Sequence, residues 1–70
     1  MKISVLMGVY NCASTLGEAI ESIQKQTYED WELIICDDGS TDDTYDIAKK
    51  YAELDKRIIV IHNKKNQWHL

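Results

Sequence analysis

Two adjacent carboxylates, Asp37 and Asp38, are the side chains of this sequence best placed to do chemistry. They directly follow the apolar run 31–36 and precede Gly39 and a group of helix-capping residues. A buried strand that ends in this way delivers both aspartates to its carboxyl end, where open α/β sheets bind ligands. Carboxylates there can accept hydrogen bonds from ring N–H groups and ribose hydroxyls, or ligate a divalent cation.

A second polar loop follows the strand-like run 2–7 and contains Gly8, Tyr10 and Asn11. Because single helices connect the expected strands, the strands must be parallel and their crossovers right-handed. Both loops therefore emerge side by side at the same edge of the sheet. The sequence predicts that Tyr10, on which a base can stack, and Asn11 lie near the two aspartates.

Familiar phosphate and metal motifs do not fit these loops. A dinucleotide site needs three spaced glycines, whereas the first loop has Gly8 alone, and no glycine-rich turn leads into Lys and Ser or Thr. A calcium loop would need regularly spaced ligands and a closing Glu. The aspartates within 37–43 would repel a bare phosphate, because a like-charge pair at ~4 Å costs about 1–4 kcal/mol. We interpret the loops as a nucleoside site; the plainer alternatives are turn chemistry at the aspartates and a core position for Tyr10.

The strands that must position these loops are the runs 2–7, 31–36 and 57–62. They are nearly continuous in apolar residues, which is typical of parallel strands buried on both faces. The predicted fold class is α/β, with a β-α-β-α-β Rossmann-like parallel sheet in the order 3-2-1. In that order the first strand keeps a bare edge, which invites pairing with another chain.

Two amphipathic helices connect the strands. The first is predicted to open at a capping box of Thr15 and Glu18, and the second to be capped by Thr41 or Asp42. Their apolar stripes, at helical spacing, are Leu16, Ala19, Ile20 and Ile23 in the first and Ile47, Ala48, Tyr51 and Ala52 in the second.

Size and charge narrow the classes of protein further. Seventy residues make at most one domain, and the net charge of −4 argues against nucleic acid as the main partner. Cys12 and Cys36 are expected to be small buried hydrophobes rather than a disulfide. The chain opens directly on a strand and no run approaches the about 18 apolar residues of a membrane span, so neither a signal peptide nor a span is expected.

Three segments together, 4–11, 19–28 and 31–44, resemble the start of a family 2 inverting glycosyltransferase with the GT-A fold. The similarity covers residues 2 to about 66. It implies that 1–66 form the N-terminal nucleotide-sugar-binding half of such a domain and that 67–70 are a tail outside the family pattern. One departure is Gly8, where the family usually has proline.

The resemblance also implies roles for the two loops. The tyrosine that matches Tyr10 packs against the base of a nucleotide-sugar, commonly UDP, and the aspartate that matches Asp38 bonds the base. Asp37 and Gly39 shape that pocket. The expected nucleotide-binding residues are therefore Val9, Tyr10, Asn11, Asp37, Asp38 and Gly39.

Other parts of the family's machinery are not expected in this chain. Such enzymes hold the donor diphosphate through Mg²⁺ or Mn²⁺ on an Asp-x-Asp motif beyond the third strand, and a later acidic residue deprotonates the acceptor hydroxyl. We therefore expect no catalytic residue and no metal ligand here, and no sugar transfer by this chain alone. The resemblance further implies a saccharide or lipid-linked acceptor for the whole enzyme and a cytoplasmic location, often at the inner membrane face.

Two hypotheses from other classes compete with this one. The first is a non-catalytic α/β module that forms a homo-oligomer through the edge of its first strand, with nucleotide affinity as a relic. The second is a phosphoacceptor receiver-type domain. In such a domain the aspartate pair should follow the first strand, whereas here it follows the second.

Overall fold

The computed structural model describes residues 2–26 and 29–63. The expected tail over 67–70 lies outside the described residues. The elements run β1 (Ile3–Val9), α1 (Ala13–Gln24), β2 (Trp31–Asp37), α2 (Thr44–Leu54) and β3 (Ile58–His62). All strand pairs are parallel and the sheet order is β1-β2-β3, with β2 in the middle. The predicted α/β class with three parallel strands and two connecting helices is confirmed.

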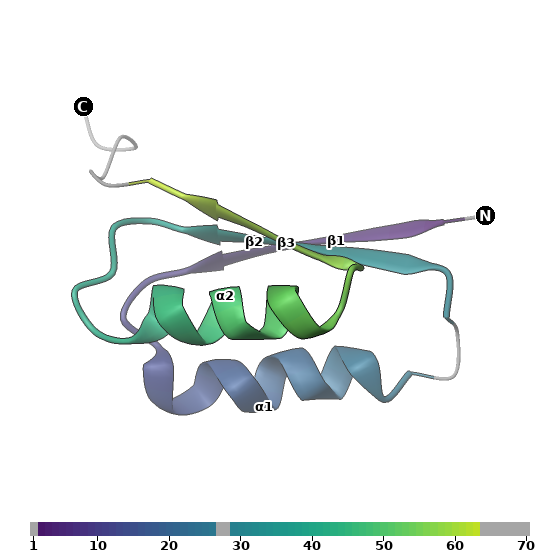
Figure 1. The fold of residues 1–70 in the computed structure, drawn as a ribbon, viewed down its shortest axis with the longest axis horizontal. Coiled ribbons are helices and arrows are strands. Elements are labelled where there is room, and N and C mark those ends of the chain that lie inside the picture. The colour runs from purple at the N-terminus through teal and green to yellow at the C-terminus, as the bar shows by residue number, and fades with distance from the viewer. Residues whose placement is uncertain (1, 27–28, 64–70) are drawn as a thin grey trace.

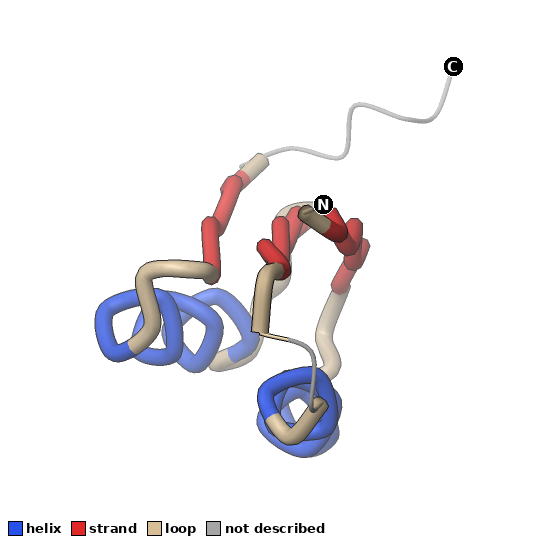
Figure 2. The backbone as a smooth tube through the Cα atoms, turned by 90° about the vertical axis from the view of Figure 1, so that its right-hand side faces the viewer, coloured by secondary structure: helices blue, strands red, loops and turns tan. Residues whose placement is uncertain are grey.

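Both helices lie against the same face of the sheet, next to each other (Figure 1 and, at right angles to it, Figure 2). The arrowheads of the three strands point to the same side, so the loops after β1 and β2 emerge together (Figure 1). This is the edge at which the sequence placed its polar loops. Connectivity alone was enough to predict that placement.

The core lies between the helices and the inner face of the sheet. Alternate residues of β2 are buried, because successive side chains of a strand point to opposite faces. The fully buried aliphatic side chains are Leu33 and Ile35 from β2 and Leu16 and Ile20 from α1, and Ala48 of α2 is also inaccessible. These positions include three of the residues that the helical stripes predicted.

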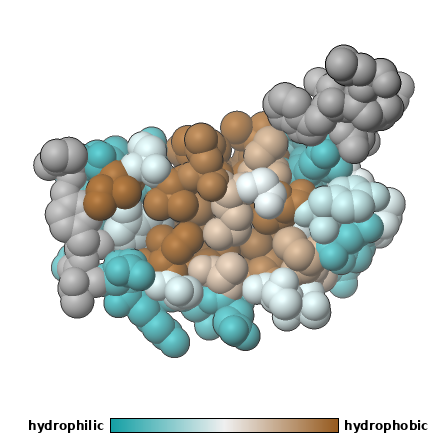
Figure 3. All heavy atoms as spheres, turned by 180° about the vertical axis from the view of Figure 1, so that it is seen from behind, coloured by the Kyte–Doolittle hydropathy of each residue, from teal (hydrophilic) through white to brown (hydrophobic). Residues whose placement is uncertain are grey.

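The expectation that the strands are buried on both faces is wrong for the described part of the chain. Leu6 of β1 is 78% exposed, and Ile59 and Ile61 of β3 are also exposed. The register aligns Leu6 with Ile34 of β2 and Ile34 with Ile59, so these residues form a row across the outer face. Seen from behind, apolar surface spreads over the middle of the molecule and up to the side where the sheet lies (Figure 3). The apolar runs reflect a sheet whose second face none of the described elements covers.

The predicted start of the first helix is also wrong. The helix α1 begins at Ala13, without a side-chain cap from its N-cap residue, Cys12. Thr15 donates its hydroxyl to the carbonyl of Cys12 at 3.4 Å instead of closing a capping box. Side chains of the second loop satisfy the exposed amides at this end. Thr44 accepts from the amide of Cys12 at 2.8 Å, and Asp42 accepts from that of Ala13 at 3.3 Å.

Candidate functional site at the carboxyl edge of the sheet

The backbone brings the two loops together where β1 and β2 end. Val9 pairs with Asp37 in the parallel register, and the amide of Asp38 donates to the carbonyl of Val9 at 3.0 Å. The second aspartate is thus tied to the first loop by the main chain. The predicted proximity of the two loops is confirmed.

Asn11 joins the loops through its backbone and its side chain. Its amide donates to the Ser40 hydroxyl at 2.9 Å, and its Oδ1 accepts from the amide of Thr41 at 2.8 Å. The backbone of Asn11 has φ of 49°, a left-handed conformation that Asn tolerates better than most residues. Gly39 has φ of 78° and supplies the matching turn in the second loop. The described contacts of Asn11 therefore hold the loops in shape.

The two aspartates point in different directions because they are consecutive in an extended segment. Asp37 faces the helices and its side chain is 0% exposed. One oxygen, Oδ1, accepts the hydroxyl of Ser40. The other, Oδ2, lies 3.3 Å from Nε2 of His62, an ion-pair distance without hydrogen-bond alignment. The carboxylate of Asp37 thus contacts residues of the protein itself and does not face the solvent.

Asp38 instead lines a hollow of about 400 Å³, together with Gly8, Val9, Tyr10 and Cys36. Its Oδ1 atom is buried and has no hydrogen-bond partner among the residues that the structure describes. Leaving a buried acceptor unpaired costs about 1–3 kcal/mol, which a ligand N–H at this place would recover. Tyr10 is 58% exposed beside the hollow, so the alternative of a core position for Tyr10 is wrong. The hollow therefore brings an exposed aromatic side chain next to a carboxylate that has one unpaired, buried oxygen within the described part of the chain.

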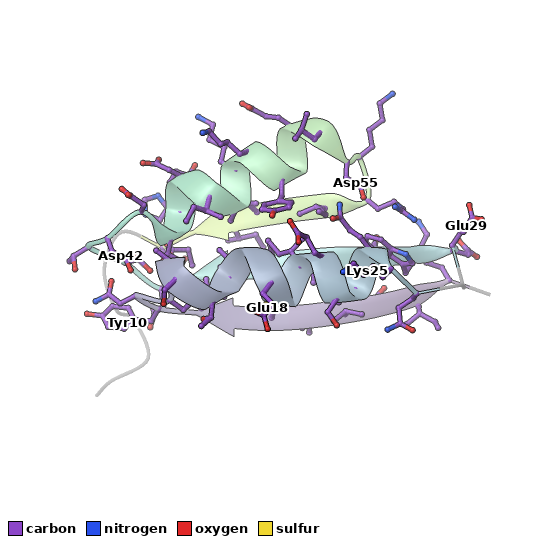
Figure 4. All side chains as sticks on the ribbon, turned by 90° about the horizontal axis from the view of Figure 1, so that it is seen from below. Tyr10, Glu18, Lys25, Glu29, Asp42 and Asp55 are labelled. Carbon is purple, nitrogen blue, oxygen red and sulfur yellow. The ribbon has the colours of Figure 1, made fainter. Side chains whose placement is uncertain are left out.

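Asp42 is another acidic residue of the second loop. The Thr44 hydroxyl, and after it the Thr44 amide, hold the pKa of the Asp42 carboxyl below its usual value. Asp42 therefore stays charged and joins the start of α2 to the start of α1. Tyr10 and Asp42 project at the same end of the molecule (Figure 4).

The sequence analysis did not single out His62. The β2–β3 register pairs Asp37 with His62, and the His62 ring stacks on Tyr45 of α2 with centroids 4.0 Å apart and planes 19° apart. Both neighbours are distant in sequence from His62. No local signal in the sequence marks this pair, because the register of β2 against β3 decides it.

The described residues 2–26 and 29–63 include no group of three or more His, Cys, Asp and Glu side chains that could hold a metal ion. In the same residues no helix is long and apolar enough to cross a membrane. Cys12 and Cys36 are half-buried free thiols.

The fold is that of an α/β protein with an acidic hollow at the carboxyl edge of a parallel sheet. The model of the glycosyl transferase family 2 matches residues 4–70. The chain therefore belongs to this family, and the resemblance seen in the sequence is confirmed.

Curated relatives agree with this assignment. The chain is 58% identical to the putative glycosyltransferase EpsE of Bacillus subtilis over 94% of its own length and 24% of the relative's. It is 49% identical to the UDP-Glc:alpha-D-GlcNAc-diphosphoundecaprenol beta-1,3-glucosyltransferase WfaP of Escherichia coli over 87% of its length and 24% of the relative's. The chain thus spans about a quarter of the length of these relatives.

Proposed function

We propose that this chain is the nucleotide-sugar-binding part of a glycosyltransferase, and that the hollow between β1 and β2 takes the nucleoside of a UDP-sugar. The observation that carries the proposal is the buried Oδ1 of Asp38, which has no hydrogen-bond partner within residues 2–26 and 29–63, beside the exposed side chain of Tyr10. An acceptor oxygen suits the imino N–H of a pyrimidine, and an aromatic face suits its ring. The name of WfaP, which specifies UDP-Glc, supports the choice of UDP.

In this proposal the chain is the first half of a GT-A domain, with its described strands in the Rossmann-like arrangement. Val9 and Gly39 shape the hollow, while Asn11 and Asp37 hold the loops around it. The diphosphate would be held through Mg²⁺ or Mn²⁺ by residues of the rest of the enzyme. That part would also supply the base that deprotonates the acceptor hydroxyl, so the chain alone would bind the donor without transferring its sugar.

The acceptor in this proposal is a saccharide or a lipid-linked saccharide, as the name of WfaP states for that relative. The enzyme would work in the cytoplasm, at the inner face of the membrane where lipid-linked acceptors lie.

The test is an amide NMR titration of the labelled chain with UDP, with and without Mg²⁺. We expect saturable shifts confined to the amides of 9–11 and 37–40. Asp38→Ala should weaken UDP binding by roughly tenfold or more, because it removes a charged acceptor. Glu53→Ala, an equal loss of charge on the exposed far part of α2, is the control and should bind like the unchanged chain. Equal affinities for both variants would contradict the proposal.

A second candidate is a homo-oligomer formed through β1, in which nucleotide affinity is a relic. It is favoured by the position of β1 at the edge of the sheet and by Ile3 and Leu6, which are 48% and 78% exposed. An edge strand with exposed apolar residues can pair with another chain. Light scattering at tens of micromolar distinguishes the two: a monomer that binds UDP supports the first candidate, and a dimer that does not bind supports the second.

A further inference from the structure

The buried carboxylate of Asp37, at the carboxyl edge of the sheet, contacts other residues through both of its oxygens. An ionised carboxylate removed from water is unstable unless it is paired and hydrogen-bonded. The Asp37 side chain is fully inaccessible, and its two oxygens contact residues from different parts of the fold. Ser40 from the same loop occupies Oδ1, and His62 from the end of β3 lies against Oδ2. Asp37 thus links the second loop to the third strand.

The His62 ring is held in one orientation by Tyr45. The two rings are nearly parallel, with centroids 4.0 Å apart, and the side chain of His62 is only 30% exposed. The backbone anchors the same place, because the amide of Asn63 donates to the carbonyl of Asp37 at 2.8 Å. The end of β3 is therefore fixed against Asp37 through both main chain and side chain.

From Asp37 the contacts continue to the first loop. The Ser40 oxygen that donates to Asp37 also accepts from the amide of Asn11 at 2.9 Å. Asn11 directly follows Tyr10, whose ring lies beside the hollow. A continuous path of contacts runs from His62 through Asp37 and Ser40 to the loop that carries Tyr10.

We propose that His62 is a positioning residue for the nucleoside hollow, which acts through Asp37 and Ser40 to hold the Tyr10–Asn11 loop against Asp38. For its ligand this inference rests on the proposed function, whereas the path of contacts does not depend on any ligand. His62 itself lies on the helix-covered side of the sheet, where it stacks on Tyr45, and it is not among the residues that line the hollow.

Two substitutions separate the polar contact of His62 Nε2, which lies 3.3 Å from Asp37 Oδ2, from the stacking of its ring on Tyr45. His62→Phe keeps an aromatic ring to stack on Tyr45 but offers no N–H to Asp37. His62→Gln loses the ring but places an amide N–H at about the same reach. If the polar contact with Asp37 positions the loop, Gln rescues binding and Phe does not. If His62 only fills space, Phe is the better replacement.

The experiment is the UDP titration of the labelled unchanged chain and both variants, followed by amide NMR. We expect His62→Phe to weaken UDP binding by roughly tenfold and to shift the amides of Asn11, Ser40 and Thr41 before any ligand is added. His62→Gln should stay within about threefold of the unchanged chain. Unmoved loop amides with unchanged affinity in His62→Phe, or a larger loss in His62→Gln than in His62→Phe, would overturn the inference.

Two further results complete the test. If His62→Phe does not fold, Tyr45→Leu takes its place, because it removes the ring on which His62 stacks. We expect Tyr45→Leu to shift the amides of the same loop. Unshifted amides would overturn the inference. If the unchanged chain does not bind UDP, the proposed function fails. The ligand-free shifts of Asn11, Ser40 and Thr41 in the variants then still decide whether His62 positions the loop.

Discussion

The two ends of the sheet use the same kinds of side chain for different purposes. At the amino end, Arg57 lies 3.9 Å above the ring of Trp31 and donates to both oxygens of Asp55 at 3.0 and 2.9 Å. The backbone amide of Arg57 also donates to Asp55 at 3.0 Å, and Gln24 of α1 donates to it at 3.1 Å. At the carboxyl end, Asp38 keeps one oxygen without a partner among the described residues, and Tyr10 presents its ring to solvent.

The difference indicates that, in this small α/β fold, the residues that stabilise the chain and the residues that can bind a ligand lie at opposite ends of the sheet. An aromatic ring, a carboxylate and a cation that satisfy one another within the chain stabilise it, as at the amino end. At the carboxyl end, the aromatic ring and the carboxylate do not pair with each other, so a ligand can contact both. Asp55 and Glu29 lie at the end of the molecule opposite to Tyr10 and Asp42 (Figure 4), so each end can be altered without touching the other.

The largest effect is expected from breaking the amino end with Arg57→Ala. The variant loses the contact with Trp31 and leaves Asp55, which is 13% exposed, without its cation. We expect the free energy of unfolding to fall by about 2 kcal/mol, and the melting temperature by roughly 10 °C. Thermal unfolding followed by circular dichroism measures this. Lys56→Ala, at an exposed neighbouring position, is the control, and UDP affinity of the folded variant should not change.

The converse effect is expected from Tyr10→Ala at the carboxyl end. Loss of the aromatic face should weaken UDP binding by roughly fivefold to tenfold, because stacking of a base on an aromatic side chain contributes about 1–3 kcal/mol and Tyr10 is partly solvated. The melting temperature should stay within about 2 °C, since Tyr10 is 58% exposed. Tyr10→Phe keeps the ring and should bind like the unchanged chain. A loss of stability as large as that of Arg57→Ala would remove the distinction between the ends.

The smallest expected effect is a loss of folding stability at low pH, which arises from Asp55 at the amino end of the sheet. The side-chain hydrogen bonds from Arg57 lower the pKa of Asp55 from 3.8 to about 2. A carboxyl whose pKa falls on folding adds stability that is fully present above about pH 4 and is lost as the pH falls through about 2. Because the Arg57 side chain is 37% exposed, water screens the pair and we expect a loss of roughly 1 kcal/mol.

Urea unfolding at pH 5, 3 and 2 measures this loss, with Asp55→Asn as the comparison. The variant cannot titrate at this position, so its stability should fall less between pH 5 and pH 2 than that of the unchanged chain. The same decline in both proteins would show that other carboxyls, such as Asp42, whose pKa is also lowered, account for the acid dependence.

The elements and the meeting of the loops could be predicted from the sequence because they depend on local periodicity and on connectivity. The apolar runs placed the strands, and the parallel arrangement then placed Tyr10 near Asp38. The capping box at Thr15 failed because Thr44, from a distant segment, satisfies the start of α1 instead. A hydrogen-bond partner that only the tertiary structure brings close cannot be predicted from a local sequence pattern.

The partner of His62 escaped prediction for a related reason. It is decided by the register of β2 against β3, and a shift by one residue would turn the side chain to the other face. The exposure of the outer face of the sheet could not be predicted, because an apolar strand has the same composition whether its second face is covered or not. The different directions of Asp37 and Asp38, by contrast, follow from strand alternation once the end of β2 is known.

The bonds that Thr44 and Asp42 make to the start of α1 have a consequence for the order of folding. The amide of Cys12 finds its acceptor 32 positions later in the chain, so the first turn of α1 cannot be completed by local contacts. The entropy of closing that long loop must be overcome before the helix end is secured. We therefore expect the opening turn of α1 to become stable together with the second loop, rather than as a helix that nucleates alone.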